Sequence, residues 1–191
     1  MPQSVVEAKR ALRAEVRARR LGRDALDREA DAASLRGALQ LLVEAVGARS
    51  VAAYLSRSDE PDTRGFLAWA ADAGLRVLLP VSRADGGLGW VEDDGSETVD
   101  EAGMPAPGGE PAGPGALESV GLVLVPAAAV GRDGSRLGWG RGYYDRALAS
   151  ALPTAPVYAV IFDEELVDEV PAEPHDIPVD GVVTPSGITH F

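Results

Sequence analysis

Residues 122–151 read LVLVPAAAVGRDGSRLGWGRGYYDRALASA, and this stretch decides the fold. It begins with a short apolar run, Leu122–Pro126, whose length and composition are typical of a strand buried on both faces. It ends with a helical pattern at Tyr143–Ala151. A loop rich in glycine lies between the two. The stretch therefore predicts a strand, a glycine-rich loop and a helix, in that order.

Further apolar runs of strand length lie on both sides of this stretch. They are Val51–Leu55, Val77–Val81, Val157–Phe162 and, more weakly, Val182–Thr184. A helical pattern at Thr63–Ala73, stopped by Gly74, separates the first two runs. Because strands and helices alternate, we predict an α/β protein: a single three-layer α/β/α, Rossmann-like domain over residues 1–191 with a mostly parallel central sheet.

In such folds, ligands bind beyond the carboxyl ends of the strands. These ends are followed here by residues 56–60, 127–142 and 163–165. Residues 82–118 are instead irregular and rich in glycine, proline and acid, with a possible hairpin near Gly89–Val91. They predict a long surface loop, which serves either as a flexible spacer or as a flap on the substrate side.

Two helices are expected before the first strand. Ser4 and Glu7 have the spacing of a capping box, so they predict a helix that runs to about Leu21. A second helix is expected over Asp24–Val46, with Gly47 as the residue that ends it.

The first of these helices has an apolar side and a basic side. The apolar side carries Val5, Leu12 and Val16, and the basic side carries Lys9, Arg13 and Arg17. Like charges four residues apart repel mildly, so a bound anion would relieve the repulsion. Charge alone favours the simpler alternative of a solvated helix face. However, Lys9 is the only lysine beside 17 arginines, which hints that a compact ammonium group is needed there.

The composition limits the class of protein. The net charge is −12, and residues 1–23 contribute +5, which leaves −17 for the rest of the chain. An acidic body argues against a general nucleic-acid binder. The absence of cysteine excludes a disulfide framework and a thiolate metal site. With no apolar run of about 18 residues and no apolar core in a leader, we expect a cytoplasmic protein without a membrane partner.

The glycine-rich run Arg136–Asp145 has the composition of an anion site. Alternating glycines let backbone N–H groups approach an anion closely, and the helix that follows adds a positive dipole end. Arg136 and Arg141 can neutralise phosphate oxygens, and Asp145 can hold a divalent cation. Glycines alone would favour an ordinary turn, but the arginines, tyrosines and aspartate beside them favour an anion site. The run lacks the Walker A pattern.

The order of these residues is also familiar. The run R-L-G-W-G-R-G-Y-Y-D-R after L-V-L-V-P resembles the signature of 5-formyltetrahydrofolate cyclo-ligases, also called methenyltetrahydrofolate synthetases. The resemblance covers nearly the whole chain. Its other parts are K-R-A-L-R at Lys9–Arg13, Tyr54-Leu55 followed by E-P-D-T at residues 60–63, and P-A-E-P-H-D-I-P-V-D at Pro171–Asp180.

The resemblance implies a reaction of ATP and Mg²⁺ with 5-formyltetrahydrofolate that gives 5,10-methenyltetrahydrofolate, ADP and phosphate. It implies that ATP binds Lys9, Arg13, Arg136, Leu137, Gly138, Trp139, Gly140, Arg141, Gly142, Tyr143 and Tyr144. Mg²⁺ would bind Asp145 and Asp180, and the folate would contact Leu55 and Glu60. We expect Arg141 and Tyr144 to act in catalysis, and we expect a monomer.

One stretch departs from the family. After V-P the family usually has G-x-A-F-D, whereas Ala127–Ala129 lead here into Val130 and Gly131, without the aromatic residue or the acid. This departure supports an alternative, a non-catalytic relative that binds nucleotide or folate. A protein that binds nucleic acid through the basic helix is a third and weaker hypothesis. His175 and Asp176 are candidates for catalysis, and the alternative for His175 is a structural residue that caps a turn.

Overall fold

The computed structural model describes residues 4–83, 86–99, 105–113, 115–151, 154–173 and 176–191. The helices are α1 (Val5–Gly22), α2 (Ala25–Val46), α3 (Arg64–Asp72) and α4 (Tyr143–Ala151), with short 3₁₀ helices η1 (Ala116–Ser119) and η2 (Asp163–Glu165). The strands are β1 (Ser50–Ala52), β2 (Arg76–Ser82), β3 (Leu88–Glu92), β4 (Glu97–Val99), β5 (Pro105–Pro107), β6 (Leu122–Pro126), β7 (Ala129–Gly131), β8 (Arg136–Leu137), β9 (Val157–Val160), β10 (Leu166–Val167), β11 (Gly181–Thr184) and β12 (Gly187–His190).

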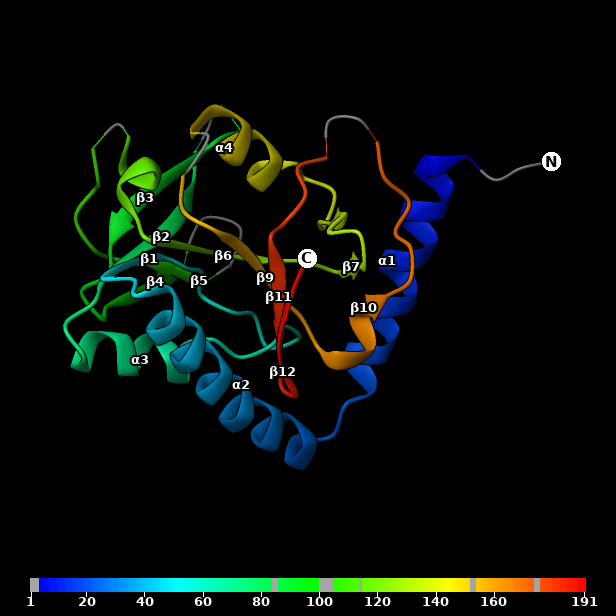
Figure 1. Cartoon of the computed structure of the whole chain (residues 1–191), viewed down its shortest axis with the longest axis horizontal. Helices are drawn as coiled ribbons and strands as arrows, with labels where there is room; N and C mark the ends of the chain where they lie inside the picture. Colours follow the sequence, from blue (N-terminus) through cyan, green and yellow to red (C-terminus); the bar gives the residue numbers. More distant parts are fainter. Residues whose placement is uncertain (1–3, 84–85, 100–104, 114, 152–153, 174–175) are drawn as a thin grey trace.

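The central sheet has seven strands in the order β12-β11-β9-β6-β1-β2-β3 (Figure 1). Its inner strands β11, β9, β6, β1 and β2 run parallel, and the edge strands β12 and β3 are antiparallel to their neighbours. The apolar runs of the sequence form these inner strands because both faces of the sheet are covered. The predicted α/β fold with a mostly parallel sheet is confirmed.

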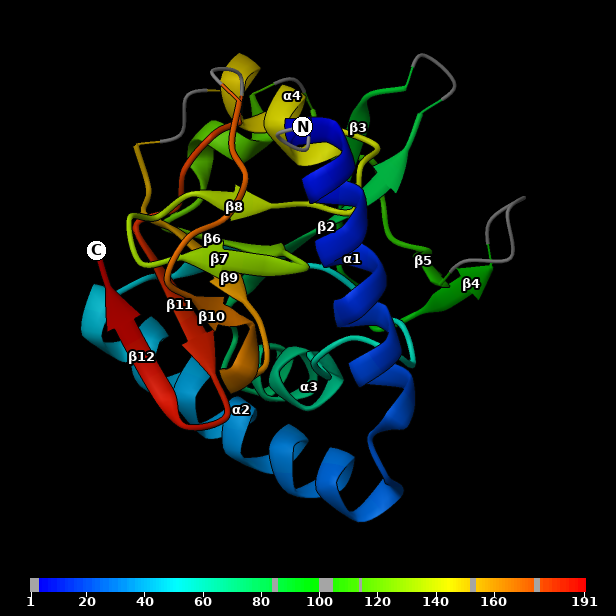
Figure 2. The same ribbon diagram turned by 90° about the vertical axis from the view of Figure 1, so that its right-hand side faces the viewer.

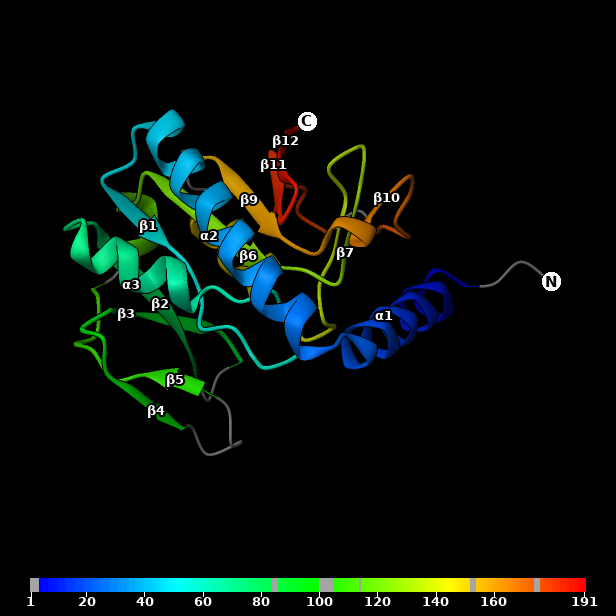
Figure 3. The ribbon, with the colours of Figure 1, turned by 90° about the horizontal axis from the view of Figure 1, so that it is seen from below.

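Helices cover the two faces of this sheet. On one face lie α2 and α3 (Figure 3). Residues such as Leu39 and Phe66 of these helices pack in one core with Val51 and Leu79 of the sheet. On the other face, η1 and Leu148 of α4 pack on alternate strand residues. Neighbouring strand residues thus enter opposite cores, which produces the three predicted layers.

Helix α1 lies outside these layers. It packs on a second, three-stranded sheet of order β10-β7-β8 (Figure 2). Val16 of α1 is fully buried there against Ala128 and Leu137. This contact carries the basic side of α1 to the glycine-rich run, although the two are more than 100 residues apart in sequence.

The helix ends agree closely with the sequence prediction. Ser4 and Glu7 form both hydrogen bonds of a capping box, and Gly47 ends α2 in the left-handed conformation. Val5, predicted on the apolar side of α1, is instead 42% exposed and is not among the apolar residues that pack with the small sheet.

The region 82–118 is more ordered than predicted. Strand β3 pairs with β2, which confirms the predicted hairpin, and β4 pairs with β5. Val91 of β3 is buried, so packing on the core supplies order that the glycine-rich composition did not suggest. Residues 84–85, 100–104 and 114 lie outside the described residues. Across the described parts of the chain, no helix combines the length and the apolar character needed to cross a membrane.

Candidate active site

Two cavities meet at the glycine-rich run, at the carboxyl end of the central sheet. The large cavity, about 600 Å³, is lined by Leu55, Glu60 and the predicted residues Arg136, Gly138, Trp139, Arg141, Gly142, Tyr143, Tyr144 and Asp145. The small cavity, about 220 Å³, is lined by Lys9, Arg13, Leu137, Gly138, Gly140, Gly142 and Asp145. Gly138, Gly142 and Asp145 line both cavities. Of the predicted site residues, only Asp180 lines neither.

The backbone of the run is shaped by its glycines. Gly140 and Gly142 have φ of +93° and +63°, a conformation that residues with a Cβ adopt only at a cost. A Cβ at Gly140 would also lie 3.4 Å from the guanidinium of Arg13, whose Nε donates a 2.7 Å hydrogen bond to the carbonyl of Gly138. The turn therefore brings the run against α1.

Arg136 links the start of the glycine-rich run to helix α4. Its side chain is buried, and Nη2 donates to the carboxylate of Asp145 in the first turn of α4. Nε of Arg136 has no hydrogen-bond partner among the described residues. Because a buried donor is costly to leave unpaired, this atom is available to an acceptor that enters the large cavity.

Lys9 lies in the small cavity between two carboxylates. Its Nζ is 2.8 Å from Oε2 of Glu173 and 2.5 Å from Oδ2 of Asp176. Burial disfavours the charged ammonium, but the hydrogen bonds that it donates to the two carboxylates, together with their negative charge, outweigh burial and raise the pKa of Lys9 above its ordinary value. The ammonium predicted from the composition is therefore charged and held at the cavity wall.

Carboxylates in the small cavity also indicate where a divalent cation would fit. Asp145, Glu173 and Asp176 line it together. No group of three or more His, Cys, Asp or Glu side chains within the described ranges is arranged to hold a metal ion by itself. Mg²⁺ in proteins is usually held by one or two carboxylates, with waters and the phosphates of a substrate as its other ligands.

Asp180, which the resemblance pairs with Asp145 at Mg²⁺, lines neither cavity, and its role as a ligand stays a prediction. The Asp180 carboxylate accepts a 2.7 Å hydrogen bond from the backbone N–H of Val157, the first residue of β9. Asp180 thus lies at the amino end of the parallel strands, whereas Asp145 lies at their carboxyl end. Among the described aspartates of the 171–180 segment, Asp176 is the one that reaches the cavity. His175 lies outside the described residues.

The large cavity contains buried polar groups as well as apolar ones. Burial and the nearby charge of Glu60 raise the pKa of the Tyr144 hydroxyl, which therefore stays protonated. Burial also raises the pKa of Glu60 above its ordinary value. Arg141 is exposed at the mouth of the cavity, with its guanidinium 6.0 Å from the ring of Tyr143.

Thr98 and Pro105–Pro107 of the β4–β5 pair form another wall of the large cavity. Of the two roles predicted for the segment 82–118, this position favours a flap on the substrate side over a flexible spacer.

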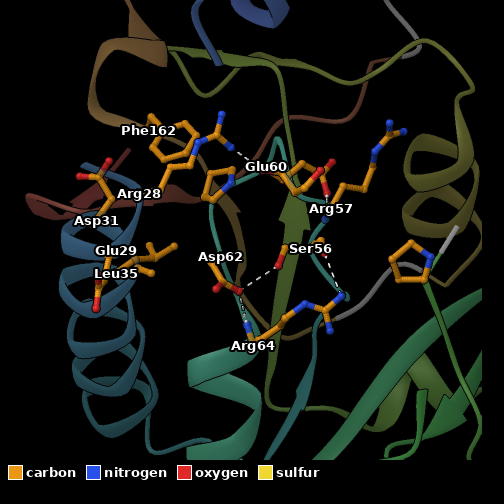
Figure 4. Close-up of a pocket in the computed structure, with 14 residues that line it drawn as sticks. Arg28, Glu29, Asp31, Leu35, Ser56, Arg57, Glu60, Asp62, Arg64 and Phe162 are labelled. Carbon is orange, nitrogen blue, oxygen red and sulfur yellow. Dashed lines mark hydrogen bonds between the residues drawn. The ribbon is translucent and has the colours of Figure 1, made fainter. Parts of the chain in front are cut away.

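A third cavity of about 570 Å³ adjoins the large one and shares Arg57, Glu60 and Pro105 with it. Figure 4 shows Glu60 beside Arg57 in this cavity. Its other arginines have structural partners. Arg28 donates to the carbonyls of Ser58 and Arg20, and Arg64 pairs with Glu97. We therefore treat this cavity as an outer extension of the large one.

A buried ion pair anchors the far end of α1. Nε and Nη2 of Arg20 lie 2.7 Å from the two carboxylate oxygens of Glu165, and Nη2 also donates to the carbonyl of Ala127. The guanidinium of Arg20 lies 4.9 Å from the centre of the Trp139 ring. This pair was missed at the level of sequence, because an arginine in a basic helix gives no sign that it is buried.

The departure from the family pattern lies away from the cavities. Val130 is fully buried in β7, where it pairs with Arg136 of β8 and packs in the core. Neither Val130 nor Gly131 lines the large or the small cavity. The missing aromatic and acidic residues therefore change packing beneath the site and not its described lining.

A parallel α/β sheet that carries a glycine-rich loop, buried cations and carboxylates at its carboxyl end is typical of proteins that bind nucleotide phosphates. Comparison with known proteins narrows this class. The chain belongs to the 5-formyltetrahydrofolate cyclo-ligase family, whose model matches residues 5–185.

Individual relatives agree with this assignment. The chain is 43% identical over 169 residues to the 5-formyltetrahydrofolate cyclo-ligase of Mycolicibacterium smegmatis, covering 83% of this chain and 84% of that protein. It is 35% identical over 150 residues to the enzyme of the same name from Escherichia coli, covering 75% and 81%. The solved structure of Aquifex aeolicus 5,10-methenyltetrahydrofolate synthetase superimposes with a TM-score of 0.81 at 25% identity, covering 95% of this chain and 92% of that one.

Proposed function

We propose that this chain catalyses the ATP-dependent ring closure of 5-formyltetrahydrofolate to 5,10-methenyltetrahydrofolate, with release of ADP and phosphate. The observation that carries the proposal is the junction of two chemically different cavities at the glycine-rich run. The small cavity offers Lys9 and Arg13 to phosphates. The large cavity offers Leu55, Glu60 and tyrosines to a heteroaromatic ring. A phosphoryl donor and a folate placed in them would meet at Gly138 and Gly142.

The reaction explains why such a site needs no nucleophile of its own. The oxygen of a formamide is a very poor leaving group. Transfer of the γ-phosphoryl group of ATP to that oxygen activates the formyl carbon, and N10 of the same folate then attacks this carbon. Phosphate departs with the C–O bond electrons and N10 loses its proton, which leaves the methenyl bridge. The protein has to position two substrates and neutralise phosphate charge.

Each part of the site has a role in this scheme. Lys9 and Arg13 would neutralise the phosphates, and Arg136 would donate from the floor of the junction. Arg141 at the mouth and the neutral hydroxyl of Tyr144 would stabilise the charge that develops on the transferred group. Asp145 and Asp176 would hold Mg²⁺, which supplies charge neutralisation to the ATP phosphates when it is bound.

The proposal is tested with purified protein, ATP, Mg²⁺ and 5-formyltetrahydrofolate. We expect the absorbance of the methenyl product to appear together with one ADP per product, and neither to appear without ATP. Tight binding of both substrates without turnover, at protein concentrations near that of the folate, would instead identify a non-catalytic binding protein. The departure at Val130 gives that alternative no structural support, since it lies outside the cavities.

The partners and the location belong to the same proposal. We place the protein in the cytoplasm, where ATP is available, with the folate as its small-molecule partner and no nucleic-acid or membrane partner. We expect a monomer. Light scattering of the purified chain at increasing concentration measures this directly, and a mass near twice 19.9 kDa would contradict it.

A further inference from the structure

Tyr54 is one of the residues that line the large cavity. It follows β1, a strand in the middle of the sheet, and only 3% of its surface is exposed. Its ring packs in the core shared by α2, α3 and the sheet, while the residue also lines the large cavity next to Leu55. Tyr54 therefore places a phenol at the carboxyl end of the sheet, where ligands of this fold bind.

The hydroxyl of Tyr54 is buried and has no hydrogen-bond partner among the described residues. Tyr158, a second buried tyrosine, shows the usual arrangement, because its hydroxyl lies 2.6 Å from Nδ1 of His190. Leaving a buried hydroxyl unpaired costs about 1–3 kcal/mol, and phenylalanine would fill the same space without that cost. The hydroxyl is thus suited to an acceptor that enters the cavity.

The neighbours of Tyr54 define which acceptor fits. Burial and the nearby carboxylate of Glu60 hold the pKa of Tyr54 well above its ordinary value, so the phenol is a neutral donor. Glu60, in the same cavity, offers carboxylate oxygens as acceptors. A donor beside an acceptor matches the edge of a cyclic amide, in which a carbonyl oxygen lies next to an N–H group. The pterin ring of a folate has such an edge, with its oxygen on C4.

The position of Tyr54 also separates it from the reacting end of the folate. The formyl oxygen has to face the phosphates, which the small cavity would hold, and Tyr54 does not line the small cavity. The charges nearest to the Tyr54 hydroxyl are those of Glu60 and of the buried Arg20–Glu165 pair, and Tyr144 also lies within electrostatic range. With Lys9 and Arg13 in the other cavity, we assign the Tyr54 hydroxyl to recognition of the ring.

We propose that Tyr54 is a substrate-recognition residue whose hydroxyl donates a hydrogen bond to the C4 oxygen of the pterin ring. The carboxylate of Glu60 would accept hydrogen bonds from the neighbouring N–H groups of the same ring. The inference rests on the proposed function, since it takes the folate as the occupant of the large cavity. Tyr54 thereby joins the candidate folate contacts Leu55 and Glu60, whereas the sequence alone predicts only that it lies in a strand.

The test is a cycle of two proteins and two ligands, measured by calorimetry. The proteins are the wild type and Tyr54→Phe. The ligands are 5-formyltetrahydrofolate and its 4-deoxy analogue, which has hydrogen in place of the C4 oxygen. We expect Tyr54→Phe to bind 5-formyltetrahydrofolate roughly 3- to 10-fold more weakly. The same substitution should leave the affinity for the 4-deoxy analogue unchanged within about twofold, because the acceptor is already missing.

Two controls accompany the cycle. Tyr158→Phe removes the hydroxyl of the other buried tyrosine, which does not line the large cavity. It should leave the affinities for 5-formyltetrahydrofolate and for the 4-deoxy analogue unchanged. ATP affinity of Tyr54→Phe, measured on the same sample, should equal that of the wild type and reports that the fold is intact. An equal loss for both folates, or no loss for either, overturns the role of Tyr54. A wild type that binds no folate at all overturns the proposed function instead.

Discussion

The two ends of α1 are held by ion pairs of opposite character. At the carboxyl end, Arg20 and Glu165 are each 1% exposed, and the guanidinium meets both carboxylate oxygens. At the amino end, Lys9 meets Glu173 and Asp176, whose side chains are 34% and 13% exposed and line a cavity. One pair is closed to ligands, and the other faces the space where phosphates would bind.

The comparison teaches that one helix can serve both as an anchor and as a part of the site. A dry, bidentate pair is costly to break because it leaves a buried charge, so it fixes the position of α1. An ammonium whose carboxylate partners line a cavity is placed to exchange those partners for a phosphate that enters it. We therefore expect substitutions at the first pair to change stability, and substitutions at the second to change ligand use.

The largest effect is expected for Arg20→Met, which leaves the carboxylate of Glu165 buried without its partner. The free energy of unfolding should fall by about 3–5 kcal/mol, measured by urea unfolding monitored by circular dichroism. The double variant Arg20→Met/Glu165→Leu removes both charges and should recover at least half of the loss. A loss below about 1 kcal/mol for the single variant would show that the pair does not anchor α1.

At the amino end of α1, Lys9→Ala should change the use of ATP. The ATP concentration needed for half-maximal rate should rise roughly 10- to 100-fold, because a charged partner of the phosphates is lost. The requirement for 5-formyltetrahydrofolate should stay within about twofold. Lys9→Arg keeps the charge but not the compact ammonium and should fall between the two. Equal effects of Lys9→Ala on ATP and on folate would mean that Lys9 has been misassigned.

The carboxylates around Lys9 provide a matched pair of variants, Asp176→Asn and Asp180→Asn. Asp176→Asn should raise the Mg²⁺ concentration needed for turnover by at least about tenfold, as expected when a group at a metal site is removed. Asp180→Asn should leave it within about twofold, because this side chain bonds Val157 at the other end of the strands. The reverse result would support Asp180 as the partner of Asp145.

The smallest effect is expected for Gly140→Ala. Gly140 belongs to the glycine-rich run and lies against Arg13, which is between the two ends of α1. Its φ of +93° disfavours a residue with a Cβ, and the added methyl group would contact Arg13. We expect a loss of about 1 kcal/mol in unfolding free energy and a weaker interaction with ATP, measured by thermal unfolding with and without the nucleotide. Gly22→Ala, near the end of α1 with open space at its Cβ, is the control and should cost less.

Much of the fold could be predicted from patterns between residues that are close in sequence. The capping box of Ser4 and Glu7, the apolar run Leu122–Pro126 and the helix at Tyr143–Ala151 depend on neighbours in sequence, and each was found where the sequence predicts it. The strand runs at Val51–Leu55 and Val157–Phe162 were predicted a few residues too long. Buried residues continue past the last ladder bonds, so hydropathy alone does not show where a strand ends.

Residues that depend on the path of the chain could not be predicted in the same way. Asp176 and Asp180 lie four residues apart in one irregular segment, and only the tertiary structure shows which one reaches the cavity. Arg20 reads as one more basic residue of an amphipathic helix until Glu165 meets it. Tyr54 reads as a strand residue, and its unpaired hydroxyl is visible only when the surrounding atoms are placed.

The single ammonium of Lys9 has a practical consequence for experiments in solution. Because the chain has no other lysine, reductive methylation with a ¹³C-labelled reagent would introduce only one side-chain NMR signal, together with that of the terminal amine. That signal would come from the wall of the small cavity, so its chemical shift would report occupancy of the site without any further engineering. For the same reason, coupling the protein to a surface through lysine would attach it by its own candidate phosphate site, and immobilisation should use another group.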